Sequence, residues 1–185
     1  YGINSSVSNF NPLVTSDEKV IYWMDQMKFY DAVMHAMKTD QSWIVPENLT
    51  PLIKSDGDHY TTGMSTDGTQ IFLTSYDPYL TGELYSSKFE NGLWTELQKL
   101  NNNVNTVFNE THATLTPDGK SLYFTSDRKG GYGGMDIYRS EKNEQGEWKK
   151  PVNLGPLINS PYNEESPFIC SDGSKLFFSS QGHYN

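Results

Sequence analysis

The sequence lacks the features that mark several large classes of protein. It has a single cysteine, Cys170, which excludes an internal disulfide bond. No apolar run approaches the roughly 20 residues that a helix needs to cross a bilayer, so we expect no membrane span. No secretory signal is recognisable at Tyr1, which indicates a cytosolic chain, a mature chain or a fragment of a longer one.

Positive charge is also scarce. Lys and Arg together number 14 against 23 Asp and Glu, which gives a formal net charge of −9. Because an acidic surface repels phosphate groups, we expect no nucleic-acid partner and no binding to anionic lipid. Aromatic residues make up 14% of the chain, and a composition rich in rings, Gly and Asn favours strands and turns over helices.

A repeat of about 50 residues runs through the 185-residue chain. Its anchors are an Asp in a turn-like setting, spaced by 50, 51 and 54 residues, and a Trp, spaced by 51 and 54. These structural positions are Asp17, Asp67, Asp118 and Asp172, with Trp43, Trp94 and Trp148. Because several anchors keep one register, we place the repeats at about 4–53, 54–104, 105–158 and 159–185.

The residue pattern of each complete repeat predicts four strands. A β-rich run such as 120–126 follows an Asp-Gly turn, and 135–141 is the next strand. A strand containing the Trp and a strand leading to the next Asp-Gly turn complete the unit. Four strands in about 50 residues are typical of a propeller blade. We therefore predict an all-β fold, with residues 1–185 forming one partial β-propeller of about 3.5 four-stranded blades.

The first repeat allows a second interpretation. Residues 20–38 also fit an amphipathic helix with Met27, Met34 and Met37 along one stripe. The repeat register favours strands. We also expect the natural protein to continue beyond both ends, or an open arc to be completed by another chain, because each blade packs only on its neighbours.

Residues 116–142, followed by Trp148 and 151–167, resemble the TolB-type, WD-like propeller repeat. More narrowly, they resemble the repeats of OmpA-family cell-envelope proteins of Bacteroidota, and the resemblance extends over essentially the whole chain. It implies a periplasmic protein associated with the outer membrane, with other cell-envelope proteins as partners. It further implies a role near type IX secretion and a link to peptidoglycan through a flanking domain.

The stretch "SDRKGGYGGMDIYRS", residues 126–140, raises the question of a phosphate-binding loop. Such loops lead into a helix, whereas these glycines lead into a predicted strand and no Gly-Lys-Ser/Thr closes the run. We interpret the stretch as a turn. Asp136 is expected to anchor it, either by accepting backbone N–H bonds or by pairing with Arg128.

No residue pattern predicts catalysis, a cofactor or a metal ion. The segment around Ser65 is one residue too long for a nucleophile elbow, and its repeat-mate Cys170 is predicted to be a buried small residue. A zinc site from His59 and His112, or a loose calcium site at 55–59 or 101–105, is the alternative to solvated loops. We therefore predict that the protein is not an enzyme and has no cofactor.

The longer connections of the predicted blades are rich in tyrosine, and long loops on a rigid scaffold are the usual place for binding. The candidate partner-binding residues are Tyr30, Tyr76, Tyr79, Arg128, Tyr132, Tyr162 and Tyr184. The alternative is that some of these rings pack between blades. The leading functional hypothesis is a module that scaffolds protein–protein interactions in a bacterial cell-envelope assembly. The alternatives are a glycan- or peptidoglycan-fragment-binding module and the propeller domain of a larger peptidase or glycosidase.

Overall fold

The computed structural model describes residues 6–75 and 81–183. Every regular element in these two ranges is a β-strand, which confirms the all-β prediction. The described residues include no helix of the length and apolar character needed to cross a membrane.

The strands form four antiparallel sheets, which follow one another along the chain. The first has the order β1 (Asn9–Val14), β2 (Val20–Gln26), β3 (Asp31–Met37) and β4 (Glu47–Asn48). The second contains β5 (His59–Met64), β6 (Gln70–Ser75), β7 (Leu84–Glu90) and β8 (Leu93–Trp94), and β9 (Gln98–Lys99) also pairs with β7. The third contains β10 (Glu110–Leu115), β11 (Ser121–Ser126), β12 (Asp136–Glu141) and β13 (Val152–Asn153). The last consists of β14 (Glu164–Ile169) and β15 (Leu176–Ser180).

The helical interpretation of residues 20–38 is wrong, because they form the paired strands β2 and β3. Tyr22 and Met24 belong to the apolar cluster shared with the second sheet, whereas Trp23, between them, belongs to a separate cluster with Met34. A strand covered on both faces needs a continuous apolar run. Such a run also satisfies helical spacing, and this explains the ambiguity.

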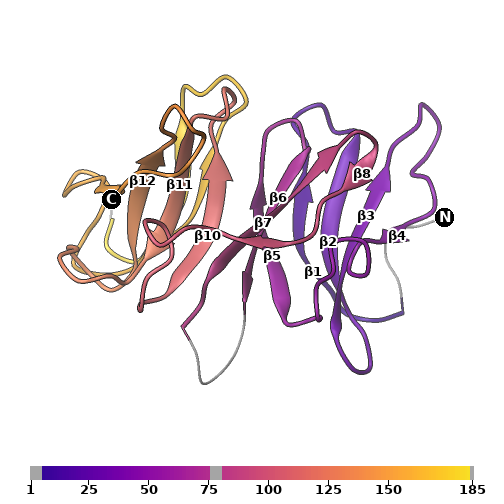
Figure 1. The fold of residues 1–185 in the computed structure, drawn as a ribbon, viewed down its shortest axis with the longest axis horizontal. Coiled ribbons are helices and arrows are strands. Elements are labelled where there is room, and N and C mark those ends of the chain that lie inside the picture. Colours follow the sequence, from indigo (N-terminus) through magenta and orange to yellow (C-terminus); the bar gives the residue numbers. More distant parts are fainter. Residues whose placement is uncertain (1–5, 76–80, 184–185) are drawn as a thin grey trace.

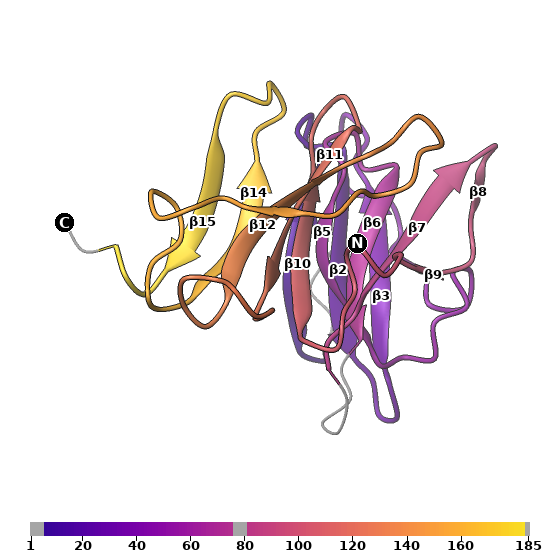
Figure 2. The ribbon, with the colours of Figure 1, turned by 60° about the vertical axis from the view of Figure 1, so that its left-hand side comes forward.

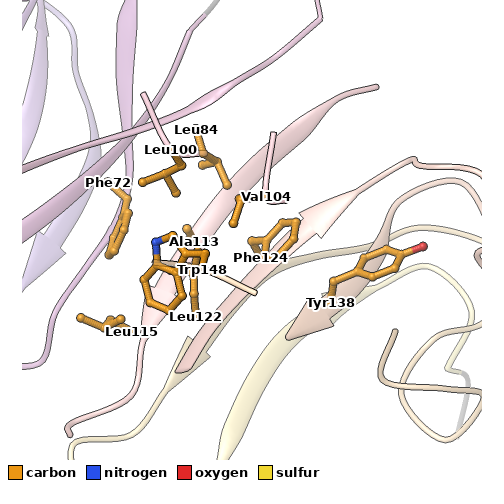
Figure 3. Close-up of a cluster of buried hydrophobic side chains, with 10 residues drawn as sticks. All are labelled: Phe72, Leu84, Leu100, Val104, Ala113, Leu115, Leu122, Phe124, Tyr138 and Trp148. Carbon is orange, nitrogen blue, oxygen red and sulfur yellow. The ribbon is translucent and has the colours of Figure 1, made fainter. Parts of the chain in front are cut away.

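Neighbouring sheets pack face to face, so the apolar core is divided among their interfaces. Between the second and third sheets, Phe72 and Leu84 come from one side and Ala113 and Leu122 from the other (Figure 3). The sheets stand side by side as blades (Figure 1), and the pair β14–β15 stands at one end of the array (Figure 2). The architecture is an incomplete propeller of about three and a half blades, as predicted.

The hairpin between the first two strands of each blade is supported by its Asp. In the second blade, Asp67 Oδ1 accepts a hydrogen bond from the Ser65 hydroxyl at 2.6 Å and another from the Thr69 N–H at 3.0 Å. Gly68 then adopts a φ of 71°, in the region that glycine reaches without strain. The first blade has Glu18 at this place, with a φ of 57°, so its turn is built the same way without glycine.

A β-bulge interrupts the first strand of every blade. The pairing of β1, β5, β10 and β14 with the following strand shifts register near the middle of each strand. β1 contacts β5, β5 contacts β10 and β10 contacts β14, so these first strands line the inner side of the arc. The bulges bend and twist them there.

The repeated tryptophans take matching places but differ in burial. Trp148 is buried, with its ring 4.8 Å from Lys142 Nζ. Trp43 and Trp94 are partly buried at the edges of other clusters. Cys170 is half-buried rather than buried as predicted.

Candidate functional site

Antiparallel strand order sorts the connections onto two faces of the arc. The Asp-Gly turns and the links that follow the third strands lie on one face, which we call the turn face. The links between second and third strands and those between blades lie on the other, which we call the loop face. Residues 116–120 and 170–175 are at the upper edge of Figure 1, and the connection 127–135 is at the lower edge.

Three of the predicted tyrosines lie on the loop face within the described residues. Tyr30, Tyr132 and Tyr162 are 40%, 50% and 55% exposed. The Tyr30 hydroxyl accepts a hydrogen bond from Asn48 Nδ2 at 3.2 Å, so this ring is partly held by its own blade. The other three, Tyr76, Tyr79 and Tyr184, lie outside the described residues.

The loop face also exposes aliphatic side chains that the sequence analysis missed. Val107 is 80% exposed and Leu157 is 90% exposed. They lie in the inter-blade links 100–109 and 154–163, neither of which contains a charged residue. We call Val107, Tyr132, Leu157 and Tyr162 the loop-face patch. An apolar residue in an Asn- and Pro-rich link was the available signal, but the sequence alone does not separate such a residue from one that packs inward.

The glycine run brings the loop between β11 and β12 against the next inter-blade link. A Cβ on Gly133 would lie 2.0 Å from the Tyr162 carbonyl oxygen, and one on Gly134 would lie 2.2 Å from Asn163 Oδ1. The Gly134 N–H donates to the Tyr162 carbonyl at 3.0 Å. These glycines therefore allow close backbone approach, and the loops that carry Tyr132 and Tyr162 form one surface.

Asp136, at the start of β12, stabilises the loop between β11 and β12. Its carboxylate accepts hydrogen bonds from the N–H groups of Tyr132 at 2.6 Å and Gly133 at 3.1 Å, and from Asn153 Nδ2 at 2.8 Å. Asp136 is 1% exposed, so these partners replace water around the carboxylate. Of the two predicted partners, the backbone N–H groups are present, and Arg128 pairs elsewhere.

Arg128 binds inside the scaffold. Its Nη2 lies 3.1 Å from Glu110 Oε1 and 2.5 Å from the Val104 carbonyl oxygen. The guanidinium also stacks on Phe124 and Tyr138, at 5.1 and 5.0 Å from the ring centroids. Only 13% of the side chain is exposed, so Arg128 joins its own blade to the preceding link and is not part of the exposed loop-face patch.

The sequence analysis did not single out Glu110 or Glu164, which are fully buried at matching places in two blades. Glu164 accepts hydrogen bonds from the Ser160 N–H and hydroxyl, at 2.7 and 2.6 Å, and from the Ser180 hydroxyl at 2.6 Å. Burial by itself would raise the pKa of Glu164, but these bonds lower it on balance. The shared spacing of a hydroxyl residue and a Glu four positions later was a usable signal.

One buried asparagine in each of two inter-blade links, 100–109 and 154–163, joins that link to the preceding blade. Asn105 bonds both the N–H and the carbonyl of Leu84, at 2.8 and 2.9 Å. Asn159 does the same with Ile137, at 2.8 and 3.0 Å. The amide side chain thus replaces a strand partner, and the base of the loop face is firmly held.

The histidines do not form a shared site. His59 Nδ1 lies 2.9 Å from Asp56 Oδ1, with its ring edge-on to Tyr85. His112 lies on the inner strand β10, where burial lowers its pKa although Glu165 acts in the opposite direction. Within residues 6–75 and 81–183, no group of three or more His, Cys, Asp or Glu residues is placed to hold a metal ion.

Solved structures share this arrangement of blades. TolB from Acinetobacter baumannii matches 97% of this chain with a TM-score of 0.69 at 22% identity, and a protein assigned as TolB from Agrobacterium tumefaciens matches 89% with a TM-score of 0.63 at 20% identity. The fold is that of a TolB-like β-propeller. The chain spans 39% and 51% of the lengths of these two proteins. No protein-family model and no curated protein matches the sequence.

The same propeller architecture also occurs in enzymes. A gluconolactonase from Xanthomonas campestris matches 96% of this chain, and 56% of its own, with a TM-score of 0.58 at 13% identity. This finding contradicts the prediction that the protein is not an enzyme, and we withdraw that exclusion. One propeller fold supports both enzymes and other proteins, because its chemistry resides in individual side chains of the loops and inner strands rather than in recognisable local motifs.

Proposed function

We propose that this propeller binds protein partners within an assembly of the bacterial cell envelope, and that the loop-face patch is its contact surface. The observation that carries the proposal is the exposure of Val107, Tyr132, Leu157 and Tyr162 on one face. Protein interfaces are enriched in aromatic residues and depleted of charge at their centre. The two uncharged links that hold three of these residues fit that composition.

The scaffold beneath the patch supports the same proposal. Asp136 accepts the Tyr132 N–H and Glu164 accepts the Ser160 N–H, in the loops that carry Tyr132, Leu157 and Tyr162. Glu110 accepts the Thr106 N–H in the link that carries Val107. A contact surface that is ordered before binding loses less conformational entropy when a partner arrives. Rigid loops with exposed rings are therefore well suited to recognition.

The cellular setting rests on the sequence resemblance of residues 116–142. On that basis we propose a periplasmic location near the outer membrane and a place in an OmpA-like, peptidoglycan-linked protein of the type IX secretion machinery. We propose these finer assignments for the whole protein, in which flanking domains would accompany this propeller.

The test compares a double variant in the patch with a matched control. Val107→Asp with Leu157→Asp places two charges in the patch, whereas Leu93→Asp changes a residue that is 73% exposed at the Asn-Gly hairpin on the turn face. The tagged proteins are cross-linked in the native host, and co-purified envelope proteins are quantified by mass spectrometry. We expect the double variant to lose its partners by about tenfold or more, since two anchor residues are disrupted, and the control to retain them.

The folded state of each variant is checked by circular dichroism before the comparison. Equal recovery of the same partners by all three proteins would show that the patch is not the contact surface. Recovery of cytosolic proteins alone would overturn the envelope assignment.

A further inference from the structure

A hollow of about 310 Å³ lies on the inner side of the arc, between the first strands of the blades. Residues of β1, β5, β10 and β14 line it, so all four blades contribute. It is separate from the loop-face patch, which lies in the connections. Its volume is at the lower end of the roughly 300–1,000 Å³ that is usual for small-molecule sites.

The bulges place polar side chains on the wall of this hollow. Asn11, His112 and Ser166 line it and have φ angles of 50°, 37° and 54°. Thr62 occupies the bulge of β5 and lines it as well. Left-handed backbone strains residues other than glycine, so glycine would be the less strained choice at three of these positions. Each position nevertheless carries a hydrogen-bonding side chain, and strained residues of this kind cluster at ligand sites.

The chemistry of the wall is polar and uncharged. Amide, hydroxyl and imidazole groups come from the bulges and from Thr114, and none of the described residues that line the hollow is Asp, Glu, Lys or Arg. Glu165 lies outside this lining but close enough to act on the pKa of His112. Burial keeps His112 neutral near pH 7, because it lowers a pKa that is ordinarily 6.5. The wall also has an apolar side, with Pro12, Pro167 and the ring of Phe168, which is 53% exposed.

We propose that this hollow binds a neutral saccharide of one or two rings. A sugar presents hydroxyl groups that donate and accept, which matches the amide, hydroxyl and imidazole groups of the wall. Its C–H face can lie on Phe168 and the two prolines, and an uncharged wall offers no partner that would offset the desolvation of a charged ligand. Addition of a peptide strand is disfavoured, because the bulges interrupt the hydrogen-bonding edges of all four inner strands.

The test is an amide-resolved NMR titration of the 185-residue chain. The probes are maltose and N,N′-diacetylchitobiose, and the charged comparators are glucosamine and glucuronic acid. We expect either neutral disaccharide to shift the amide signals of 111–114 and 165–169, with a dissociation constant in the millimolar range. We expect the charged sugars to leave these signals in place. Unshifted signals with both disaccharides at tens of millimolar, or equal shifts with the charged sugars, would overturn the proposal.

Variants at positions where φ already suits glycine reduce the effect of backbone strain on the test. Ser166→Gly and Asn11→Gly each remove a polar group from the wall at such a position. Asn11→Gly also removes a 3.3 Å hydrogen bond from Asn11 Nδ2 to the Thr61 carbonyl oxygen, so its folded state is checked by circular dichroism. We expect each to weaken disaccharide binding by about threefold to tenfold, which corresponds to one hydrogen bond. The matched control is Asn91→Gly, at a φ of 54° in the hairpin between β7 and β8 on the turn face, which should leave the affinity unchanged. Wild-type affinity in both wall variants would exclude the hollow as the binding site.

Discussion

Gly63 sets the distance between the second and third blades at the inner side of the arc. It lies in β5, and an added Cβ would lie 1.7 Å from the Ala113 carbonyl oxygen in β10. Real Cβ contacts stay beyond 3.0 Å, so Gly63→Ala would push the two backbones apart by about 1.3 Å or more. Neither atom belongs to a flexible side chain, so rotation cannot relieve the overlap. The separation must instead loosen the packed interface shown in Figure 3, which includes Phe72 and Leu122.

Overpacking in protein cores typically costs about 1–3 kcal/mol, and a backbone clash belongs at the upper end of that range. We therefore expect Gly63→Ala to lower the free energy of unfolding by about 3 kcal/mol and Tm by about 6–12 °C for a chain of this size. Urea and thermal denaturation followed by circular dichroism measure both quantities. The control is Gly82→Ala, where the nearest atoms to an added Cβ are 3.4 Å away. If Gly63→Ala unfolds within about 0.5 kcal/mol of the control, the close approach of the blades is not a constraint and the reasoning fails.

Three further changes test the scaffold. Asp136→Asn removes a buried charged acceptor and should lower the free energy of unfolding by about 2 kcal/mol. It should also speed amide hydrogen exchange in the loop 127–135, and unchanged exchange there would contradict the anchoring role of Asp136. Glu164 has a lowered pKa, so its contribution is present above the ordinary Glu value and is lost as pH falls through the lower folded value. Glu164→Gln should therefore flatten the acid limb of a stability–pH profile measured by urea denaturation, and an unchanged limb would show that other carboxylates control it. Tyr22→Phe removes a 2.7 Å hydrogen bond from a buried hydroxyl to the Gly68 carbonyl and should lower the free energy of unfolding by about 1 kcal/mol in the same assay. An unchanged free energy of unfolding would mean that this contact between blades is dispensable.

The strand pattern could be predicted from the sequence because its determinants are local. An Asp that bonds the N–H two residues later and the hydroxyl two residues earlier forms the same turn wherever it occurs, as Asp67 and Asp118 show. For residues 20–38, hydrophobic spacing alone fitted both a helix and a pair of strands, and the repeat register correctly favoured the strands.

The partners of Arg128 could not be predicted in the same way, because they lie 18 and 24 residues earlier in the chain and come close to it only through the fold. Asp136 and Arg128 are close in sequence and of opposite charge, so pairing was a reasonable expectation. In the fold, Asp136 is occupied by N–H groups of its own loop. Arg128 instead reaches Glu110 on the inner strand of the same blade and the Val104 carbonyl in the preceding link. The exposure of Val107 and Leu157 could not be predicted either, because the sequence does not show whether an apolar residue in a link faces solvent or the core.

One geometric position shows how the repeats keep a structure while changing its chemistry. The first residue of each inner strand faces the last or next-to-last residue of the second strand, and the pairs are Asn9 with Asp25, His59 with Ser75, Glu110 with Ser126 and Glu164 with Ser180. In the third and fourth blades the carboxylate is on the inner strand and the serine donates to it. In the first blade the roles are exchanged, since Asn9 donates to a carboxylate on the second strand. In these three blades an acceptor on one strand meets a donor on the other, and either strand can supply the acceptor. In the second blade His59 instead pairs with Asp56, and the Ser75 hydroxyl accepts a hydrogen bond from the Glu83 N–H. This explains why a search for identical residues across the repeats finds the exposed Asp of each turn but misses the buried carboxylates that connect the inner strands to the rest of each blade.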